Sequence, residues 1–197
     1  MGNVRIRKAT HNDRFALARI IIDATFSAFH GRVPDQCLTW IDVEESARNW
    51  GNSLNAMGSG EHLLVAEVGQ VDLVGLILAG GSTEGLISDQ ELSKLYPVEI
   101  TSLQISPAWQ GKGIGRALIW TAMEQLGQTS GSGLLVRVLR DNPNIPFYEH
   151  LGAARLGSEP YCWEGYDTYE ELLGWEDMSV PSGNRESWRQ DSYVPPG

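Results

Sequence analysis

The sequence has little cysteine and no long hydrophobic run. Two cysteines, Cys37 and Cys162, stand far apart among 197 residues, which excludes a disulfide framework and a closely spaced metal-binding motif. The longest apolar stretch, residues 73–79, is interrupted by Gly75 and is far shorter than the ~20 residues of a membrane span. The first residues also lack the apolar core of a signal peptide. We therefore expect a cytoplasmic protein with no bound metal and no membrane association.

Positive charge is also scarce. Lysine and arginine total 15 against 25 acidic residues, for a net charge of −10. Nucleic-acid binding needs a basic surface that releases counterions, so DNA and RNA are excluded as partners. The length suits one domain with a large core. We expect that domain at residues 1–175. Residues 176–197 contain several prolines and few aliphatic residues, so they are predicted to form a flexible C-terminal tail.

Hydrophobic periodicity predicts an α+β (mixed α/β) fold with a central mixed sheet of about seven strands flanked by about four helices. Thr10 followed by Asp13 has the spacing of a helix N-cap. The strand–helix–strand step across residues 99–139 predicts a right-handed parallel crossover. The predicted strands are residues 4–6, 62–68, 71–79, 99–105, 134–139, 154–163 and 166–175, and the predicted helices start near residues 10, 38, 114 and 146.

A glycine-rich turn separates the predicted strand at 99–105 from the helix that follows it. Gly111, Gly113 and Gly115 leave backbone N–H groups unshielded where that helix begins, and the positive end of its dipole attracts anions there. Lys112 and Arg116 add positive charge. This arrangement predicts a site for a phosphate or diphosphate group.

Three kinds of phosphate-binding turn can be compared with this segment. A Walker A loop needs Lys followed by Ser or Thr after its last glycine, and the segment lacks both at those positions. A dinucleotide-binding G-x-G-x-x-G turn needs a third glycine where Arg116 stands. The pattern Gln/Arg-x-x-Gly-x-Gly/Ala is matched in full by Gln110, Gly113 and Gly115.

This last pattern, joined to its surroundings, resembles the GNAT superfamily of acetyl-CoA-dependent N-acetyltransferases. An apolar strand ending in I-S-P precedes the loop, as in the family. Downstream, Asn142 and residues 147–152 resemble the family motif N-x-x-A-x-x-F-Y-x-x-x-G-F. Ala153 stands where phenylalanine is usual. The resemblance covers residues 3–175.

The resemblance implies a role for each matching residue. Tyr148 would protonate the departing CoA thiolate, and the N–H of Ile105 would polarise the thioester carbonyl. Glu99 would act as the base for the acceptor amine, with Glu67 as the alternative. Backbone N–H groups of the loop would hold the diphosphate, and Asn142 would bind the cofactor arm. The residues implied in cofactor binding are Leu103, Ile105, Gln110, Gly111, Lys112, Gly113, Ile114, Gly115, Arg116 and Asn142.

The activity that the resemblance implies is transfer of an acetyl group from acetyl-CoA to a primary amine, by direct attack in a ternary complex. The alternative is a non-catalytic acyl-CoA-binding or protein-interaction module with the same fold. Dimers are common in the family, so a homodimer is an expectation. The acceptor, a small molecule or a peptide, is left open. Residues 29–40, including Trp40, and residues 80–97 are expected to shape its pocket.

Overall fold

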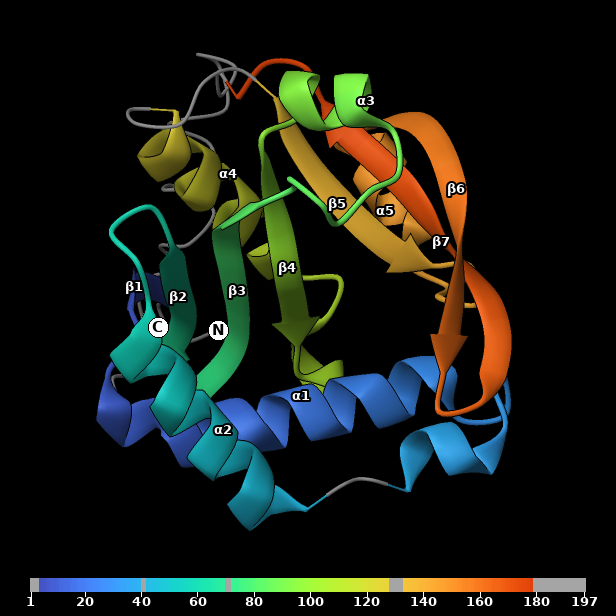
Figure 1. Ribbon diagram of the computed structural model, residues 1–197. Coiled ribbons are helices and arrows are strands. Elements are labelled where there is room, and N and C mark those ends of the chain that lie inside the picture. The colour runs from blue at the N-terminus through green and yellow to red at the C-terminus, as the bar shows by residue number, and fades with distance from the viewer. Residues whose placement is uncertain (1–3, 40–41, 70–71, 128–132, 179–197) are drawn as a thin grey trace.

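A seven-stranded mixed sheet forms the centre of the computed structural model, which describes residues 4–39, 42–69, 72–127 and 133–178 (Figure 1). The strand order is β1-β2-β3-β4-β5-β7-β6; β4 and β5 pair in parallel and the other neighbours antiparallel. This confirms the predicted α+β fold. The strands are β1 Val4–Lys8, β2 His62–Val68, β3 Asp72–Ser82, β4 Val98–Ile105, β5 Leu134–Leu139, β6 Ala154–Trp163 and β7 Tyr166–Trp175.

Five α-helices surround the sheet in the described ranges: α1 Arg14–Phe29, α2 Val43–Ala56, α3 Gln90–Leu95, α4 Ile114–Leu126 and α5 Ile145–His150. The helix expected from residue 38 is divided into a short 3₁₀ turn, η2 Asp35–Leu38, and α2. Two further 3₁₀ turns are η1 His11–Asp13 and η3 Pro107–Trp109. No helix in the described part of the chain is long and apolar enough to cross a membrane.

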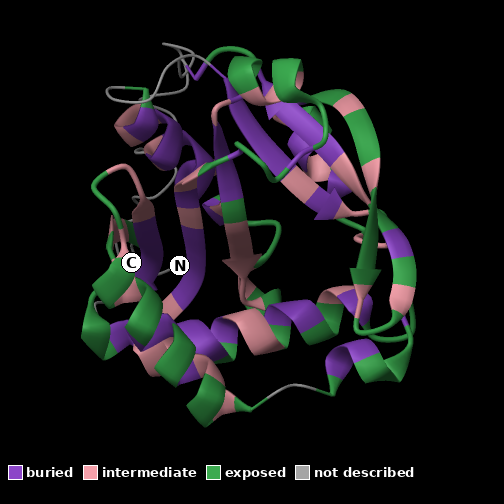
Figure 2. Ribbon diagram, viewed as in Figure 1, coloured by how far each residue is buried: buried purple, intermediate pink, exposed green. Residues whose placement is uncertain are grey.

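The two faces of the sheet carry separate cores. Along β2, Leu63 and Val65 pack with α1 and α2, whereas Leu64 and Ala66 pack with α4. This alternation follows from the two-residue period of a strand and explains the continuous apolar run in its sequence. Figure 2 shows buried residues through β2 to β5, while the edge strand β6 is mostly exposed. The central strands are therefore clamped between two layers of helices.

The parallel strands β4 and β5 stay together for only three residue pairs, from Val98↔Leu134 to Ile100↔Val136. Beyond that point β4 follows β3 and β5 follows β7, and the two diverge toward α1 (Figure 1). A register shift between β3 and β4 at Leu78 and Ala79 marks the start of this divergence. The divergence leaves one edge of the second half of β4 without a neighbouring strand.

The core extends slightly past the predicted domain boundary at residue 175. Met178 is buried in the same cluster as Trp175, and its Cβ lies 3.9 Å from the position that a Cβ on Gly127 would occupy. Met178 thus packs beside α4, whereas residues 176 and 177 are exposed. Residues 179–197 of the predicted tail lie outside the described ranges.

An ion-pair cluster joins β1, β2 and the start of α1. The guanidinium of Arg7 donates to the Asp13 carboxylate from Nη1 at 2.8 Å and Nη2 at 2.9 Å, and its Nε lies 2.5 Å from Glu67 Oε2. Asp13 also accepts from the Thr10 N–H, as the predicted capping box requires. The hydrogen bonds from Arg7, chiefly, hold the pKa of Asp13 below its usual value.

We expect Asp13→Asn to lower the free energy of unfolding by about 1–3 kcal/mol, because a buried charged hydrogen-bond partner of Arg7 is lost. The depressed pKa means that this stabilisation is present above about pH 4 and disappears as the pH falls through the folded-state pKa. Urea unfolding at about pH 7 and about pH 3 checks both points. The exposed Asp72 provides the control, since Asp72→Asn should change stability by less than about 0.5 kcal/mol. An equal loss at both pH values for Asp13→Asn would contradict the ion-pair account.

Candidate functional site

The glycine-rich loop is shaped by three glycines with different constraints. Gly111 and Gly113 have φ angles of +71° and +79°, a region that other residues rarely adopt. Gly113 is the N-cap of α4. Gly115 is limited by packing instead, because a Cβ there would lie 3.0 Å from Cζ of Phe147. The loop thus brings its backbone close to α5, and side chains at these three positions would disturb it.

Several backbone N–H groups at the start of α4 have no partner within the helix, which is the arrangement that binds anions. Ala117 N–H bonds to the Gly113 carbonyl, so Ile114 and Gly115 precede the first turn of hydrogen bonds within α4. Gln110 differs from expectation, since its backbone N–H donates to the Pro107 carbonyl at 3.3 Å. The available N–H groups therefore begin at Gly111 rather than at Gln110.

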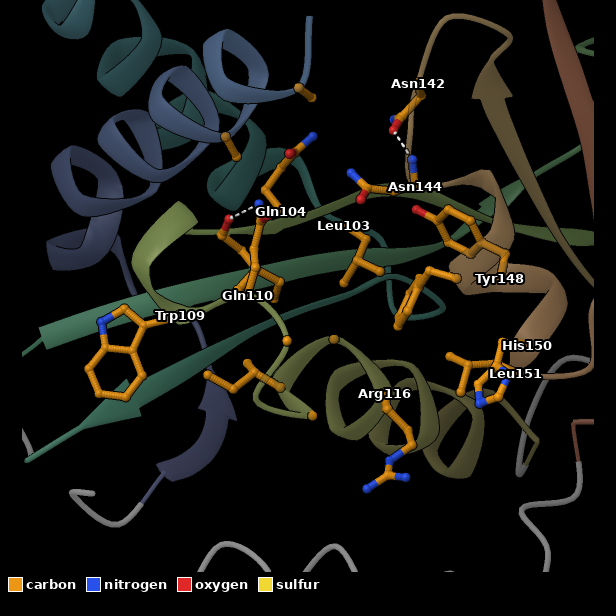
Figure 3. A pocket seen from close by; sticks show the side chains of 18 of the residues that line it. Leu103, Gln104, Trp109, Gln110, Arg116, Asn142, Asn144, Tyr148, His150 and Leu151 are labelled. Carbon is orange, nitrogen blue, oxygen red and sulfur yellow. Dashed lines mark hydrogen bonds between the residues drawn. The ribbon is translucent and has the colours of Figure 1, made fainter.

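A cavity of about 440 Å³ lies between β4, α4, α5 and α1, and we call it the β4–α4 cavity (Figure 3). Residues from α1, including Ala24, Ala28 and Phe29, close one side of it. The cavity brings together residues of both sequence motifs, which lie up to 45 positions apart in the chain, from Leu103 to Tyr148. The predicted site residues that line it are Leu103, Ile105, Gln110, Gly111, Gly113, Ile114, Gly115, Arg116, Asn142 and Tyr148.

The two cationic side chains of the loop differ in their relation to this cavity, because Arg116 lines it and Lys112 does not. Lys112 is not among the lining residues, and its Nζ lies 6.0 Å from the centroid of the Trp109 ring. The guanidinium carbon of Arg116 lies 5.1 Å from the centroid of the Trp120 ring. Figure 3 shows the Arg116 side chain pointing away from Gln104 and Tyr148. Their charge therefore acts at the mouth of the cavity and not at its inner end.

The open edge of β4 presents backbone groups to the same cavity. Ser106 N–H bonds to the Val74 carbonyl on β3. Neighbouring residues of a strand point their backbone groups in opposite directions, so the N–H and C=O of Ile105 point away from β3. The Gln110 side chain confirms this direction, because its Nε2 donates to the Ile105 carbonyl at 3.1 Å. This hydrogen bond also ties the glycine-rich loop to β4.

Tyr148 on α5 is buried, and its hydroxyl points toward Leu103 across the cavity (Figure 3). Edge-to-face contacts with Phe147 and Trp175, at centroid distances of 5.2 and 6.4 Å, orient the ring. Burial raises the pKa of Tyr148 well above its usual value of 10. The phenol therefore holds its proton at neutral pH and can donate it.

Asn142 begins the segment that leads into α5. Its Oδ1 accepts the backbone N–H of Asn144 at 2.9 Å, which closes a turn at the start of the helix. The carbonyl oxygen of the side chain is thereby occupied. The amide nitrogen is the part of Asn142 left to donate a hydrogen bond into the cavity.

A second cavity, of about 470 Å³, adjoins the first and shares Phe29 and Gln104 with it. We call it the α2–β4 cavity. Of residues 29–40, which the sequence led us to expect at an acceptor pocket, Phe29 lines this cavity, and α2 lines it as well without having been expected there. Trp40 lies outside the described ranges, and residues 82–97 line a separate cavity. The residues lining the α2–β4 cavity are Ile21, Thr25, Phe29, Ser46, Asn49, Trp50, Ser53, Leu78, Thr101, Ser102, Gln104, Leu139 and Trp163.

Glu99 lies next to Thr101, one of the residues that line this second cavity. Its Oε1 is 3.5 Å from the hydroxyl of Thr101, which lines the cavity, and its Oε2 is 3.1 Å from Nε of Arg137. Arg137 also donates from Nη1 to Glu170 at 2.8 Å. Burial, chiefly, raises the pKa of Glu170, while Arg137 acts in the opposite direction. Glu99 is buried and reaches the cavity only through Thr101.

The alternative base, Glu67, is placed differently. It is buried, paired with Arg7, and belongs to the lining of neither cavity. Its strand β2 is separated from β4 by β3. The sequence could not distinguish the two glutamates, since both stand on apolar strands. Their partners in the fold differ, since Glu67 pairs with Arg7 and Glu99 pairs with Arg137 beside Thr101.

Two sequence comparisons agree with the geometry. Residues 59–152 match the family model of the acetyltransferase (GNAT) domain. Over 177 residues the chain is 27% identical to the uncharacterized N-acetyltransferase YuaI of Bacillus subtilis (strain 168), a match that covers 90% of this chain and 95% of YuaI.

Solved structures show the same fold. The PaiA N-acetyltransferase of Thermoplasma acidophilum, solved in complex with coenzyme A, has a TM-score of 0.66 at 18% identity, covering 87% of this chain and 97% of that one. The YncA structure from Salmonella typhimurium, solved with its cofactor acetyl-CoA, has a TM-score of 0.63 at 20% identity, covering 91% of this chain and 96% of that one. With the shared motifs, these likenesses support the resemblance seen in the sequence: residues 59–152 match a GNAT acetyltransferase domain, and most of the chain has the fold of solved N-acetyltransferases.

Proposed function

We propose that this protein transfers the acetyl group of acetyl-CoA to a primary amine, with both substrates bound at once. The observation that carries the proposal is the meeting of two cavities at Phe29 and Gln104, beside the open edge of β4. One cavity has the features of a site for acetyl-CoA, and the other is free to take an acceptor. Direct attack in a ternary complex needs this adjacency.

The residues of the β4–α4 cavity suit acetyl-CoA. The N–H groups from Gly111 to Gly115 and the positive end of α4 would hold the diphosphate, with Lys112 and Arg116 near the mouth. The unpaired edge of β4 from Leu103 to Ile105 would bind the extended arm, and the amide of Asn142 would donate to it. Acetyl-CoA supplies a thioester, whose C–S bond breaks as the new C–N bond forms.

Two groups on this chain are placed to stabilise charge during that exchange. The Ile105 N–H points into the cavity and would donate to the thioester oxygen. The Tyr148 hydroxyl would give its proton to the departing sulfur. A phenol with a pKa near 10 is a weaker acid than a thiol near 8.5, so the transfer is uphill by about 2 kcal/mol before burial adds to it. The proton therefore moves as negative charge develops on the sulfur beside it.

The acceptor must lose a proton to become a nucleophile. For an amine with a pKa of about 10.4, deprotonation at pH 7 costs about 4.6 kcal/mol. Glu99 would accept that proton through the Thr101 hydroxyl or a water beside it, because Oε1 faces Thr101 while Arg137 holds Oε2. Arg137 and Glu170 are positioning residues for this carboxylate.

The diphosphate site is tested by Gly113→Glu. We expect acetyl-CoA, which the wild type binds, to bind this variant at least about 100-fold more weakly, since like charges about 4 Å apart near a protein surface repel by about 4 kcal/mol. Isothermal titration measures the affinity. Gly69→Glu is the matched control, since Gly69 also has a positive φ of 63° and lies at the far β2–β3 turn. Unchanged affinity in Gly113→Glu would rule out the loop as the phosphate site.

The proton donor is tested by Tyr148→Phe. We expect kcat for CoA release in the presence of an amine to fall about 100-fold, with an unchanged Kd for acetyl-CoA, because the ring still fills its place in the core. The exposed Tyr169 is the control, and Tyr169→Phe should leave kcat as it is. If kcat survives in Tyr148→Phe, another group protonates the sulfur.

The base is tested by comparing Glu99→Gln with Glu67→Gln. Glu99→Gln should lower kcat/KM by about 100-fold for an amine with a pKa near 10, and by less for an amine with a pKa near 8, which is easier to deprotonate. Glu67→Gln should lower the melting temperature through the loss of its pair with Arg7 and leave kcat/KM nearly unchanged. The reverse result for the two variants would exchange their roles.

A further inference from the structure

The walls of the α2–β4 cavity differ from the rest of this acidic protein. Although the net charge is −10, none of the described residues that line this cavity is charged. Its aromatic members, Phe29, Trp50 and Trp163, come from α1, α2 and β6. The described lining of this cavity thus contains no carboxylate, although it comes from several separate elements of an acidic chain.

The polar part of the lining is neutral as well. Ser46, Asn49, Trp50 and Ser53 recur at spacings of three, one and three residues, so they form one face of α2. The charged neighbours on the same helix, such as Glu45 and Arg48, are exposed and are not among the lining residues. Hydroxyl and amide groups can hydrogen-bond an acceptor but cannot neutralise a charge on it.

A cluster of charged side chains lies beside Thr101, at one end of the cavity. Arg137 is already bonded to both Glu99 and Glu170, so this cluster has two carboxylates for one guanidinium. It can attract one ammonium group toward Thr101. An acceptor's carboxylate would find no unpaired cation in this cluster. A second ammonium group on an acceptor would find no carboxylate among the described residues that line the rest of the cavity.

From this distribution of charge we infer that the acceptor is a primary amine on an uncharged, largely apolar body, of the arylalkylamine type. The inference rests on the proposed acetyl transfer. The ammonium end would enter toward Thr101 and lose its proton there, while the aromatic part lies against Trp50 and Trp163. A volume of about 470 Å³ suits a ligand of one ring and a short chain. Free amino acids and polyamines are poor acceptors, because each places an unpaired charge against neutral walls.

The test uses the full-length protein, acetyl-CoA and four amines that vary charge. The matched set is 2-phenylethylamine, L-phenylalaninamide and L-phenylalanine, which share a ring and differ at one carbon, together with spermidine. CoA release gives kcat/KM for each. We expect the two uncharged-body amines to exceed L-phenylalanine and spermidine by at least about tenfold.

A variant pair checks that the α2 face sets this preference. Asn49 is exposed at the cavity, so Asn49→Arg should fold normally and supply a cation there. It should raise kcat/KM for L-phenylalanine relative to L-phenylalaninamide at least about fivefold. Asn52 is exposed on the same helix away from the lining, so Asn52→Arg should leave the ratio unchanged.

The outcomes separate the two proposals. Preference for L-phenylalanine or spermidine in the wild type, or an equal ratio in both arginine variants, overturns the acceptor class while acetyl transfer stands. No transfer to any of the four amines, with acetyl-CoA binding intact, overturns the acceptor class and counts against the proposed function too. Preference for the uncharged bodies, shifted only by Asn49→Arg, supports the inference.

Discussion

The short parallel ladder between β4 and β5 is the constraint on which the site depends. After Ile100 each strand keeps a partner strand on one side only, so one edge of β4 faces the β4–α4 cavity as far as Ile105. This part of β4 is exposed or half-buried, and the Ile105 carbonyl on that edge accepts a hydrogen bond from the Gln110 side chain. In the proposed function the free backbone groups of this edge bind the extended arm of acetyl-CoA, and the glycine-rich loop at the end of β4 binds its diphosphate. The proposed site thus follows from the separation of two strands.

The helices keep the strands apart because each face of the sheet has its own core. α4 packs on one face and α1 with α2 on the other, and these layers bury side chains such as Leu64 and Leu63 from adjacent positions of β2. α1 also contributes Phe29 to both cavities. The helix that lines both cavities is therefore part of the core, and the proposed function assigns these cavities to two substrates.

The charged side chains lie in separate places around the two cavities. Lys112 is exposed and Arg116 half-buried beside the β4–α4 cavity, where the proposed function uses their charge to attract phosphate. Glu99 is buried and Glu170 half-buried, and Arg137 offsets part of the cost of burial by bonding to both. The α2–β4 cavity between these regions has neutral walls. In the proposed function, this separation of charges allows one acidic protein to bind an anionic donor and a cationic amine acceptor at neighbouring sites.

The sequence by itself determined the strand and helix pattern, the anion-binding loop and its family, because these depend on local spacing. Gly113 and Gly115 are needed within a few residues of each other, and backbone conformation there is set by neighbours in the chain. The tertiary structure alone decided which glutamate lies beside a cavity residue, since Glu99 and Glu67 both stand on apolar strands and differ in their arginine partners, 38 and 60 residues away, and Glu99 alone lies next to Thr101. It also decided that α2 and Trp163 line the α2–β4 cavity, because long-range packing leaves no periodic signal in the sequence.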